Sequence, residues 1–258
     1  MMTLNYPGLG IDYSLHTHTT WSDGLSSLEE LCRQGKKMGL KVLGVSDHYY
    51  IHPNMPKRTR YTAEEYVADA LKMRERYEDE NFSLKIGLEM DFFFENTEEV
   101  LKDLEQYPFD YIIGSVHYVG TFPIDHDPSY WVDLTEERKE EICAEYWRKM
   151  EAAAACEKFT FLGHLDLPKK FGLIDNSRYF SHALRVLDIL AQRQGALELN
   201  TAGWFKPCAE SYPSCSILEE AYKRHIPVVI SADAHQPEHL MRHFTEAREL
   251  LNSVGYKL

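Results

Sequence analysis

Side chains that can bind metal ions stand at the ends of short apolar runs along this chain. Two runs end in a spaced pair, His16-Thr-His18 and Asp233-Ala-His235. Alternate residues of a β-strand point to the same face, so both members of each pair could reach one ion. Imidazole and carboxylate without thiolate suit Zn²⁺, Mn²⁺ or Fe and argue against a cysteine-rich structural zinc site. The spacing therefore predicts a hydrolytic metal centre.

Other runs end in a single ligand, at His48, Glu89, His117 and His164, and Asp23 follows the first run in a Trp-Ser-Asp-Gly turn. The full candidate set is His16, His18, Asp23, His48, Glu89, His117, His164, Asp233 and His235. Nine ligands are too many for one ion, whereas three ions with about three ligands each would use them all. Glu89 is the expected bridge, because a carboxylate has two oxygens.

The remaining histidines and nearby carboxylates are assigned supporting or structural roles. Asp47, Asp91 and Asp166 are expected to orient ligands or cap helices. Six histidines are expected in the core or on the surface: His52, His126, His182, His225, His239 and His243.

The elements that must position these ligands alternate between strand-like and helix-like patterns. The apolar runs are continuous, as in strands buried on both faces of a parallel sheet. They cover residues 12–18, 41–47, 84–91, 111–117, 159–165, 196–200 and 227–233. Seven βα units predict a single α/β domain over residues 1–258 with seven-stranded, barrel-like closure. Functional groups of such barrels lie at the carboxyl ends of the strands.

Short signals predict where the intervening helices begin and end. Thr135 should begin a long helix that runs to about Glu157. Capping boxes are expected at Ser26-x-x-Glu29, Thr62-x-x-Glu65 and Ser216-x-x-Glu219. Helix ends are expected at Gly39, Gly195 and Gly255.

Composition limits the possible partners. The 258 residues carry a formal net charge of −13, which disfavours nucleic acid polymers and anionic membranes. Five cysteines, an odd number without a CxxC pair, favour reduced thiols and a cytoplasmic location. No apolar stretch is long enough to span a membrane. Nothing in the composition indicates an oligomeric state.

Three loops that follow strand ends should overhang the mouth, at residues 49–61, 118–134 and 201–214. Basic residues near this mouth are candidates for binding a phosphate group: Lys170, Lys206 and Arg178. Aromatic residues there could stack on a substrate ring: Tyr118, Trp204 and Phe205.

The ligand-bearing segments resemble, in order, the motif series of the polymerase and histidinol phosphatase (PHP) superfamily. These segments are residues 16–24, 46–48, 87–89, 114–117, 163–164 and 231–235. The resemblance implies a distorted (β/α)7 TIM-like barrel with three divalent transition-metal ions, Zn, Mn or Fe. It assigns His16, His18, Glu89 and Asp233 to the first ion, Glu89, His117 and His164 to the second, and Asp23, His48 and His235 to the third.

Within the superfamily, residues 163–172 and 198–214 look most like monofunctional histidinol-phosphate phosphatases. That resemblance implies hydrolysis of L-histidinol phosphate, a small phosphorylated substrate, to L-histidinol and phosphate. The implied nucleophile is a metal-bridged hydroxide near Glu89 and Asp233, and the proton donor is left open among His235, Asp166 and a metal-bound water. The chain has Phe205 where the family commonly has a phosphate-binding arginine.

Two alternatives remain. One is a phosphoesterase that acts on nucleotides or another small phosphate ester. The other is a metal-binding module without catalysis, which the complete ligand set disfavours.

Overall fold

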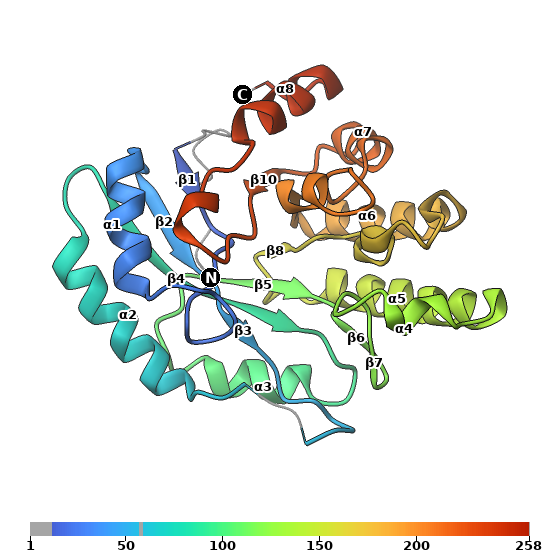
Figure 1. Cartoon of the computed structure of the whole chain (residues 1–258), viewed down its shortest axis with the longest axis horizontal. Coiled ribbons are helices and arrows are strands. Elements are labelled where there is room, and N and C mark those ends of the chain that lie inside the picture. The colour runs from blue at the N-terminus through green and yellow to red at the C-terminus, as the bar shows by residue number, and fades with distance from the viewer. Residues whose placement is uncertain (1–11, 57–58, 258) are drawn as a thin grey trace.

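Parallel strands form a nearly closed barrel at the centre of the computed structural model, which describes residues 12–56 and 59–257 (Figure 1). Neighbouring strands pair in parallel in the order β1-β2-β4-β5-β8-β9-β10. They are β1 (Tyr13–Ser14), β2 (Val42–Val45), β4 (Ser83–Asp91), β5 (Tyr111–Ser115), β8 (Phe161–Leu162), β9 (Ala196–Asn200) and β10 (Val228–Ser231). The predicted α/β class and seven-stranded barrel are confirmed. Residues 1–11, 57–58 and 258 of the predicted domain lie outside the described residues.

The two ends of the strand order meet through the ligand pairs themselves. Thr17 and Ala234 form an isolated parallel bridge. The amide of His18 donates to the carbonyl of Ala234 at 2.8 Å, and the amide of Ala234 donates to the carbonyl of His16 at 3.1 Å. The hydrogen bonds that close the barrel therefore also place the first and last ligand pairs side by side.

Helices surround the barrel and cover the outer faces of its strands (Figure 1). The longer ones are α1 (Leu28–Met38), α2 (Ala63–Tyr77), α3 (Thr97–Leu104), α5 (Glu136–Ala155), α6 (Phe180–Arg193), α7 (Cys215–Lys223) and α8 (Phe244–Val254). Short elements complete the chain: β3 (His48–Tyr49), β6 (Tyr118–Val119), β7 (Phe122–Pro123), α4 (Ser129–Val132), η1 (Leu167–Phe171), η2 (Asn176–Tyr179), η3 (Thr201–Phe205) and η4 (Pro237–His239). No helix among the described residues has the length and apolarity needed to cross a bilayer.

A buried aromatic side chain fills the inside of the barrel. Tyr111 donates its hydroxyl hydrogen to the carbonyl of Leu15 at 2.6 Å. Two neighbouring glycines make room for it, since an added Cβ would lie 2.3 Å from the Tyr111 hydroxyl at Gly44 and 2.4 Å from its ring at Gly87. The barrel is therefore a packed core, and the ligands can only gather at its mouth.

Two of the predicted helix starts are confirmed. Thr62 and Glu65 form the capping box of α2, and the side chain of Thr135 caps α5. Gly39 and Gly255 cap the ends of their helices as predicted. The predicted end at Gly195 is one residue late, because Gln194 adopts the left-handed capping conformation.

The other two predicted capping boxes are wrong in position. The box of α1 is Ser27 with Glu30 rather than Ser26 with Glu29. The carbonyl of Ser26 instead accepts a hydrogen bond from the amide of Thr20, which ties Ser26 to the ligand-bearing turn. Helix α7 begins after Ser214, so Ser216 lies inside its first turn.

Candidate metal centre

All nine predicted ligands converge at the carboxyl ends of the strands. They form four overlapping groups, within each of which one ligand atom per residue lies within 4.8 Å of the others. The groups are His18, Asp23, His48 and His235; His16, Glu89 and His164; His16, His18 and Asp233; and His48, Glu89 and His117. Positions spread over more than two hundred residues of sequence thus form one cluster.

Glu89 lies at the centre of the cluster and is 1% exposed. Its Oε2 lies 2.8 Å from Nδ1 of His48 and 3.4 Å from Nε2 of His16. Its Oε1 lies 2.8 Å from Nε2 of His164 and 3.5 Å from Nε2 of His117. The parallel pairing of β3 with β4 sets His48 directly opposite Glu89. The two oxygens therefore face two different sets of imidazoles, as a bridging carboxylate requires.

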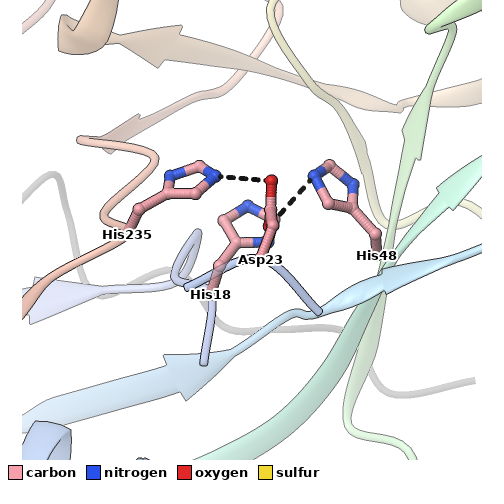
Figure 2. Close-up of side chains that lie close together, drawn as sticks. All are labelled: His18, Asp23, His48 and His235. Atoms are coloured by element: carbon pink, nitrogen blue, oxygen red, sulfur yellow. Dashed lines mark ion pairs between the residues drawn. The ribbon is translucent and has the colours of Figure 1, made fainter. Parts of the chain in front are cut away.

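Asp23 lies among His18, His48 and His235, as Figure 2 shows. Its Oδ1 lies 3.6 Å from Nε2 of His48 and 3.8 Å from Nδ1 of His18. Its Oδ2 lies 3.3 Å from Nε2 of His235. The Asp23 side chain is 57% exposed, so this part of the cluster lies at the open mouth.

Asp47 holds the turn that carries Asp23. Its Oδ1 accepts from the amide of Thr19 at 2.8 Å and from the amide of Ser22 at 3.0 Å. Its Oδ2 accepts from the hydroxyl of Thr19 at 2.9 Å. At Gly24 an added Cβ would lie 2.3 Å from the carbonyl oxygen of His18, so the turn needs glycine there. This is the supporting role expected for Asp47.

Two further carboxylates orient histidines of the cluster. Oδ1 of Asp91 lies 3.1 Å from Nδ1 of His117, in the role expected for Asp91. Oε1 of Glu198 lies 2.5 Å from Nδ1 of His16. A carboxylate at Nδ1 keeps the proton there and leaves Nε2 as a free electron-pair donor. Glu198 is not among the residues singled out from the sequence; its position at the end of an apolar run, two residues before Asn200, was the available signal.

Asp166 does not belong to the metal cluster or to the cavity above it. It is fully buried and lies 2.9 Å from Nζ of Lys169. It also accepts hydrogen bonds from the side chain of Asn176 and the amide of Ser214. These bonds join η1 to η2 and to the start of α7, so Asp166 is a structural residue and not a proton donor to substrate.

The cluster fits divalent metal ions. Within the described part of the chain, several of its buried atoms form no hydrogen bond, namely Nε2 of His16, both ring nitrogens of His18, Oε2 of Glu89 and Oδ1 of Asp233. Unpaired buried polar atoms are costly, by about 1–3 kcal/mol each. The atoms nearest to them are further ring nitrogens and carboxylate oxygens of the cluster, and a cation placed among these groups would satisfy their lone pairs.

The electrostatics of the cluster agree with a cation site. Burial acts to raise the pKa of Glu89, but the surrounding imidazoles of His16, His48 and His117 hold this pKa well below its usual range. Burial also acts to raise the pKa of Asp233, and His16, His18 and His235 overcome it in the same way. Asp233 adopts a left-handed backbone with φ of +49°, a conformation that non-glycine residues hold mainly at functional sites.

A cavity of about 1140 Å³ opens above the cluster. Of the predicted phosphate-binding residues, Lys170 and Lys206 line it. Arg178 does not line it: η2 turns outward, and the half-exposed guanidinium pairs with Glu140 on α5. That prediction is wrong.

Other lining residues include two arginines that the sequence did not single out, Arg60 and Arg242. Of the predicted aromatic residues, Tyr118 and Phe205 line the cavity and Trp204 does not.

A barrel of parallel strands with histidines and carboxylates gathered at the carboxyl ends is the architecture of a metal-dependent hydrolase. The model of the PHP domain matches residues 14–202, and the chain belongs to the PHP domain family.

Relatives of known sequence or structure agree with this assignment. A Deinococcus radiodurans protein named "Probable histidinol-phosphatase" is 37% identical over 191 residues, 74% of this chain and 72% of that protein. A protein of the same name from Thermotoga maritima is 27% identical over 94% of this chain and 92% of its own length. The crystal structure of Lactococcus lactis histidinol phosphate phosphatase, complexed with zinc, L-histidinol and phosphate, superposes with a TM-score of 0.82 at 22% identity, covering 95% of this chain and 94% of that one.

Proposed function

We propose that the protein is a metal-dependent phosphomonoesterase that hydrolyses L-histidinol phosphate to L-histidinol and phosphate. The observation that carries this proposal is the complete ligand cluster beneath a cavity lined by Lys170, Lys206 and Arg242. Metal ions and cations together suit a phosphoryl group, whose oxygens carry the charge in the transition state. The 37% identity to a protein named histidinol-phosphatase supports the choice of substrate.

We assign the cluster to three divalent transition-metal ions, with zinc the first choice. His16, His18, Glu89 and Asp233 would hold the first ion; Glu89, His117 and His164 the second; Asp23, His48 and His235 the third. Two of the spatial groups support the first and third sites, with His18 between them. For the second site, Nε2 of His164 and Nε2 of His117 lie 2.8 Å and 3.5 Å from Oε1 of Glu89. When bound, such ions lower the pKa of a water and neutralise phosphoryl oxygens.

Other roles in the proposed reaction fall to side chains of the cluster and the cavity. Glu89, in β4, and Asp233, just after β10, would hold the ions, and Glu198 and Asp91 keep His16 and His117 in the tautomers that the cluster needs. Lys206, which lines the cavity above the cluster, would bind the phosphate group.

A metal-bound water is our candidate proton donor to the leaving alkoxide, and His235 would hold an ion beside it. The side chain of His235 is 35% exposed and so reaches the cavity. Its Nδ1 lies 2.9 Å from the backbone carbonyl of Asp233, so Nδ1 carries the proton and Nε2 keeps the free electron pair with which it would hold the third ion.

A phosphate-release screen tests the proposal. The metal-loaded protein is assayed with L-histidinol phosphate, nucleoside monophosphates and a chromogenic phosphate diester, and Glu89→Gln serves as the control for contaminating phosphatases. We expect L-histidinol phosphate to be the best substrate. Efficient turnover of a nucleotide with none of L-histidinol phosphate would favour the nucleotide alternative. No turnover of any ester by fully loaded protein would favour the non-catalytic module.

A further inference from the structure

The guanidinium group of Arg242 lies over the ring of Phe205 at the edge of the cavity. Its guanidinium carbon is 3.9 Å from the centroid of the Phe205 ring. The hydroxyl of Thr201 donates to the carbonyl of Arg242 at 2.7 Å, which fixes the backbone of this turn to η3. The next residue, His243, adopts a left-handed backbone with φ of +60°. The turn before α8 is thus constrained, and it presents Arg242 to the cavity.

The guanidinium has donors that the protein does not use. Its Nε is buried and forms no hydrogen bond with residues 12–56 or 59–257. Its Nη1 has one weak contact, 3.4 Å from Nε2 of His239. Among the described residues no carboxylate forms an ion pair with Arg242. Because a guanidinium carries five N–H donors in a planar fork, most of its hydrogen-bonding capacity is free for a ligand.

The surroundings of Arg242 favour an anion. Lys206 lines the same cavity, and no residue in the described part of the chain pairs with its ammonium group. Partial burial lowers the pKa of Lys206, and the nearby charges of Lys170 and Arg242 lower it further. Lys170 is neutralised by Asp125, whose carboxylate lies 2.9 Å from its Nζ. Lys206 and Arg242 therefore lie beside the metal cluster without an ion-pair partner among the described residues, and the charge of Asp233 offsets theirs only in part. The protein as a whole carries a net charge of −13.

We infer that Arg242, seated on the ring of Phe205, binds the phosphoryl group of the substrate together with Lys206. The inference rests on the proposed function only in taking the anion to be a phosphate monoester. It also explains Phe205: the aromatic ring at this position serves as a platform for a guanidinium that comes from a different element. A guanidinium is suited to this role, since its planar fork binds two phosphate oxygens at once.

Single variants of the metal-loaded protein test the role of Arg242. Arg242→Ala should raise KM for L-histidinol phosphate and the inhibition constant of inorganic phosphate roughly tenfold or more, with a smaller change in kcat. Arg242→Lys keeps the positive charge but loses the planar fork of donors, so its KM and its inhibition constant should lie between those of the wild type and of Arg242→Ala. Arg138→Ala is the matched control, because Arg138 lies on the exposed face of α5 and pairs with Glu141.

A second substitution tests the geometry. In the Arg242→Ala background, Phe205→Arg places a guanidinium in the volume that the Arg242 group has left, and it should restore most of the lost phosphate affinity. Phe205→Arg alone brings two guanidinium groups together and should improve phosphate binding little or weaken it.

Calorimetric titration of inorganic phosphate into each loaded variant, with metal content and circular dichroism checked, separates this inference from the proposed function. If L-histidinol phosphate is not a substrate but Arg242→Ala and Arg242→Lys still weaken phosphate binding, the inference stands and the substrate assignment fails. Phosphate affinity in folded, metal-loaded Arg242→Ala equal to that of the wild type would overturn the inference. So would the absence of measurable phosphate binding in the loaded wild type.

Discussion

Glu198 and His16 form a buried pair in which Oε1 lies 2.5 Å from Nδ1 and neither side chain is exposed. Glu198 lies in β9 and His16 follows β1, so the two residues are far apart in sequence and meet where the barrel closes. The same carboxylate accepts a hydrogen bond from the amide of His164 at 2.6 Å and another from the hydroxyl of Ser231. Glu198 thus ties together the strand ends that carry ligands, while its charge fixes the tautomer of His16.

Glu198→Gln should therefore weaken metal binding without unfolding the protein. Replacing the carboxylate by an amide removes the charge that holds the proton on Nδ1 of His16, and loss of such a partner typically reduces metal affinity or activity by about 10–100-fold. Competition with a chromogenic zinc chelator measures the affinity. Glu157→Gln, at an exposed position after α5, is the control. Equal affinities in the two variants would show that Glu198 acts only in packing.

Glu89→Gln should have a much larger effect than His182→Ala. Glu89 faces four imidazoles with its two oxygens, whereas His182 lies on α6 beside Glu151, away from the cavity. We expect Glu89→Gln to lose at least one ion per chain and roughly a hundredfold or more in kcat/KM. His182→Ala should stay within about twofold of the wild type. Comparable losses in two folded proteins would mean that the site has been misplaced.

Asp47→Ala should release the turn that carries Asp23. The substitution leaves the amides of Thr19 and Ser22 without their charged acceptor, and a hydrogen bond to a charged group contributes about 1.5–3 kcal/mol. The free energy of unfolding in urea should fall by about 2–3 kcal/mol. Elemental analysis should show fewer ions per chain, because Asp23 is no longer held beside His18 and His48. A stability loss with full metal content would restrict Asp47 to a structural role.

Removal of the metal ions should destabilise the fold reversibly. A ligand that binds only the native state stabilises it by about 4 kcal/mol at a thousand times its dissociation constant. For a chain of this length that corresponds to a fall in Tm of about 10 °C after chelation. Thermal unfolding before chelation, after chelation and after addition of zinc measures the effect. The same Tm in all three states would indicate that the cluster binds no ion of consequence.

The convergence of the nine proposed ligands could be predicted from the sequence, because strand direction alone decides where such side chains gather. His48, Glu89 and His117 each follow a buried apolar run, and parallel strands bring such positions to one edge of the barrel. The supporting carboxylates were harder to predict, because the partner of Glu198 is His16, 182 residues away, and only closure of the barrel brings them together.

The residues around the substrate cavity were predicted least well. Arg178 and Arg242 are both arginines in short irregular segments, and sequence gives no sign of the direction in which such segments turn. Arg178 pairs with Glu140 on α5 and so lies away from the cavity. Arg242 lines the cavity, and the hydroxyl of Thr201 in η3 holds its backbone carbonyl. The starts of α1 and α7 shifted for a similar reason, because tertiary hydrogen bonds to Ser26 and Ser214 override the local capping pattern.

The most direct test of this account is the rate of L-histidinol phosphate hydrolysis as a function of the ions bound per chain. Metal-free protein is reconstituted with increasing zinc, manganese or iron, and phosphate release and ion content are measured on the same samples. We predict no turnover without metal and a maximum at about two to three ions per chain. At that loading, kcat/KM for L-histidinol phosphate should exceed that for nucleoside monophosphates by roughly a hundredfold or more. Turnover by metal-free protein, full activity at a single ion, or no turnover of L-histidinol phosphate at full loading would contradict the account.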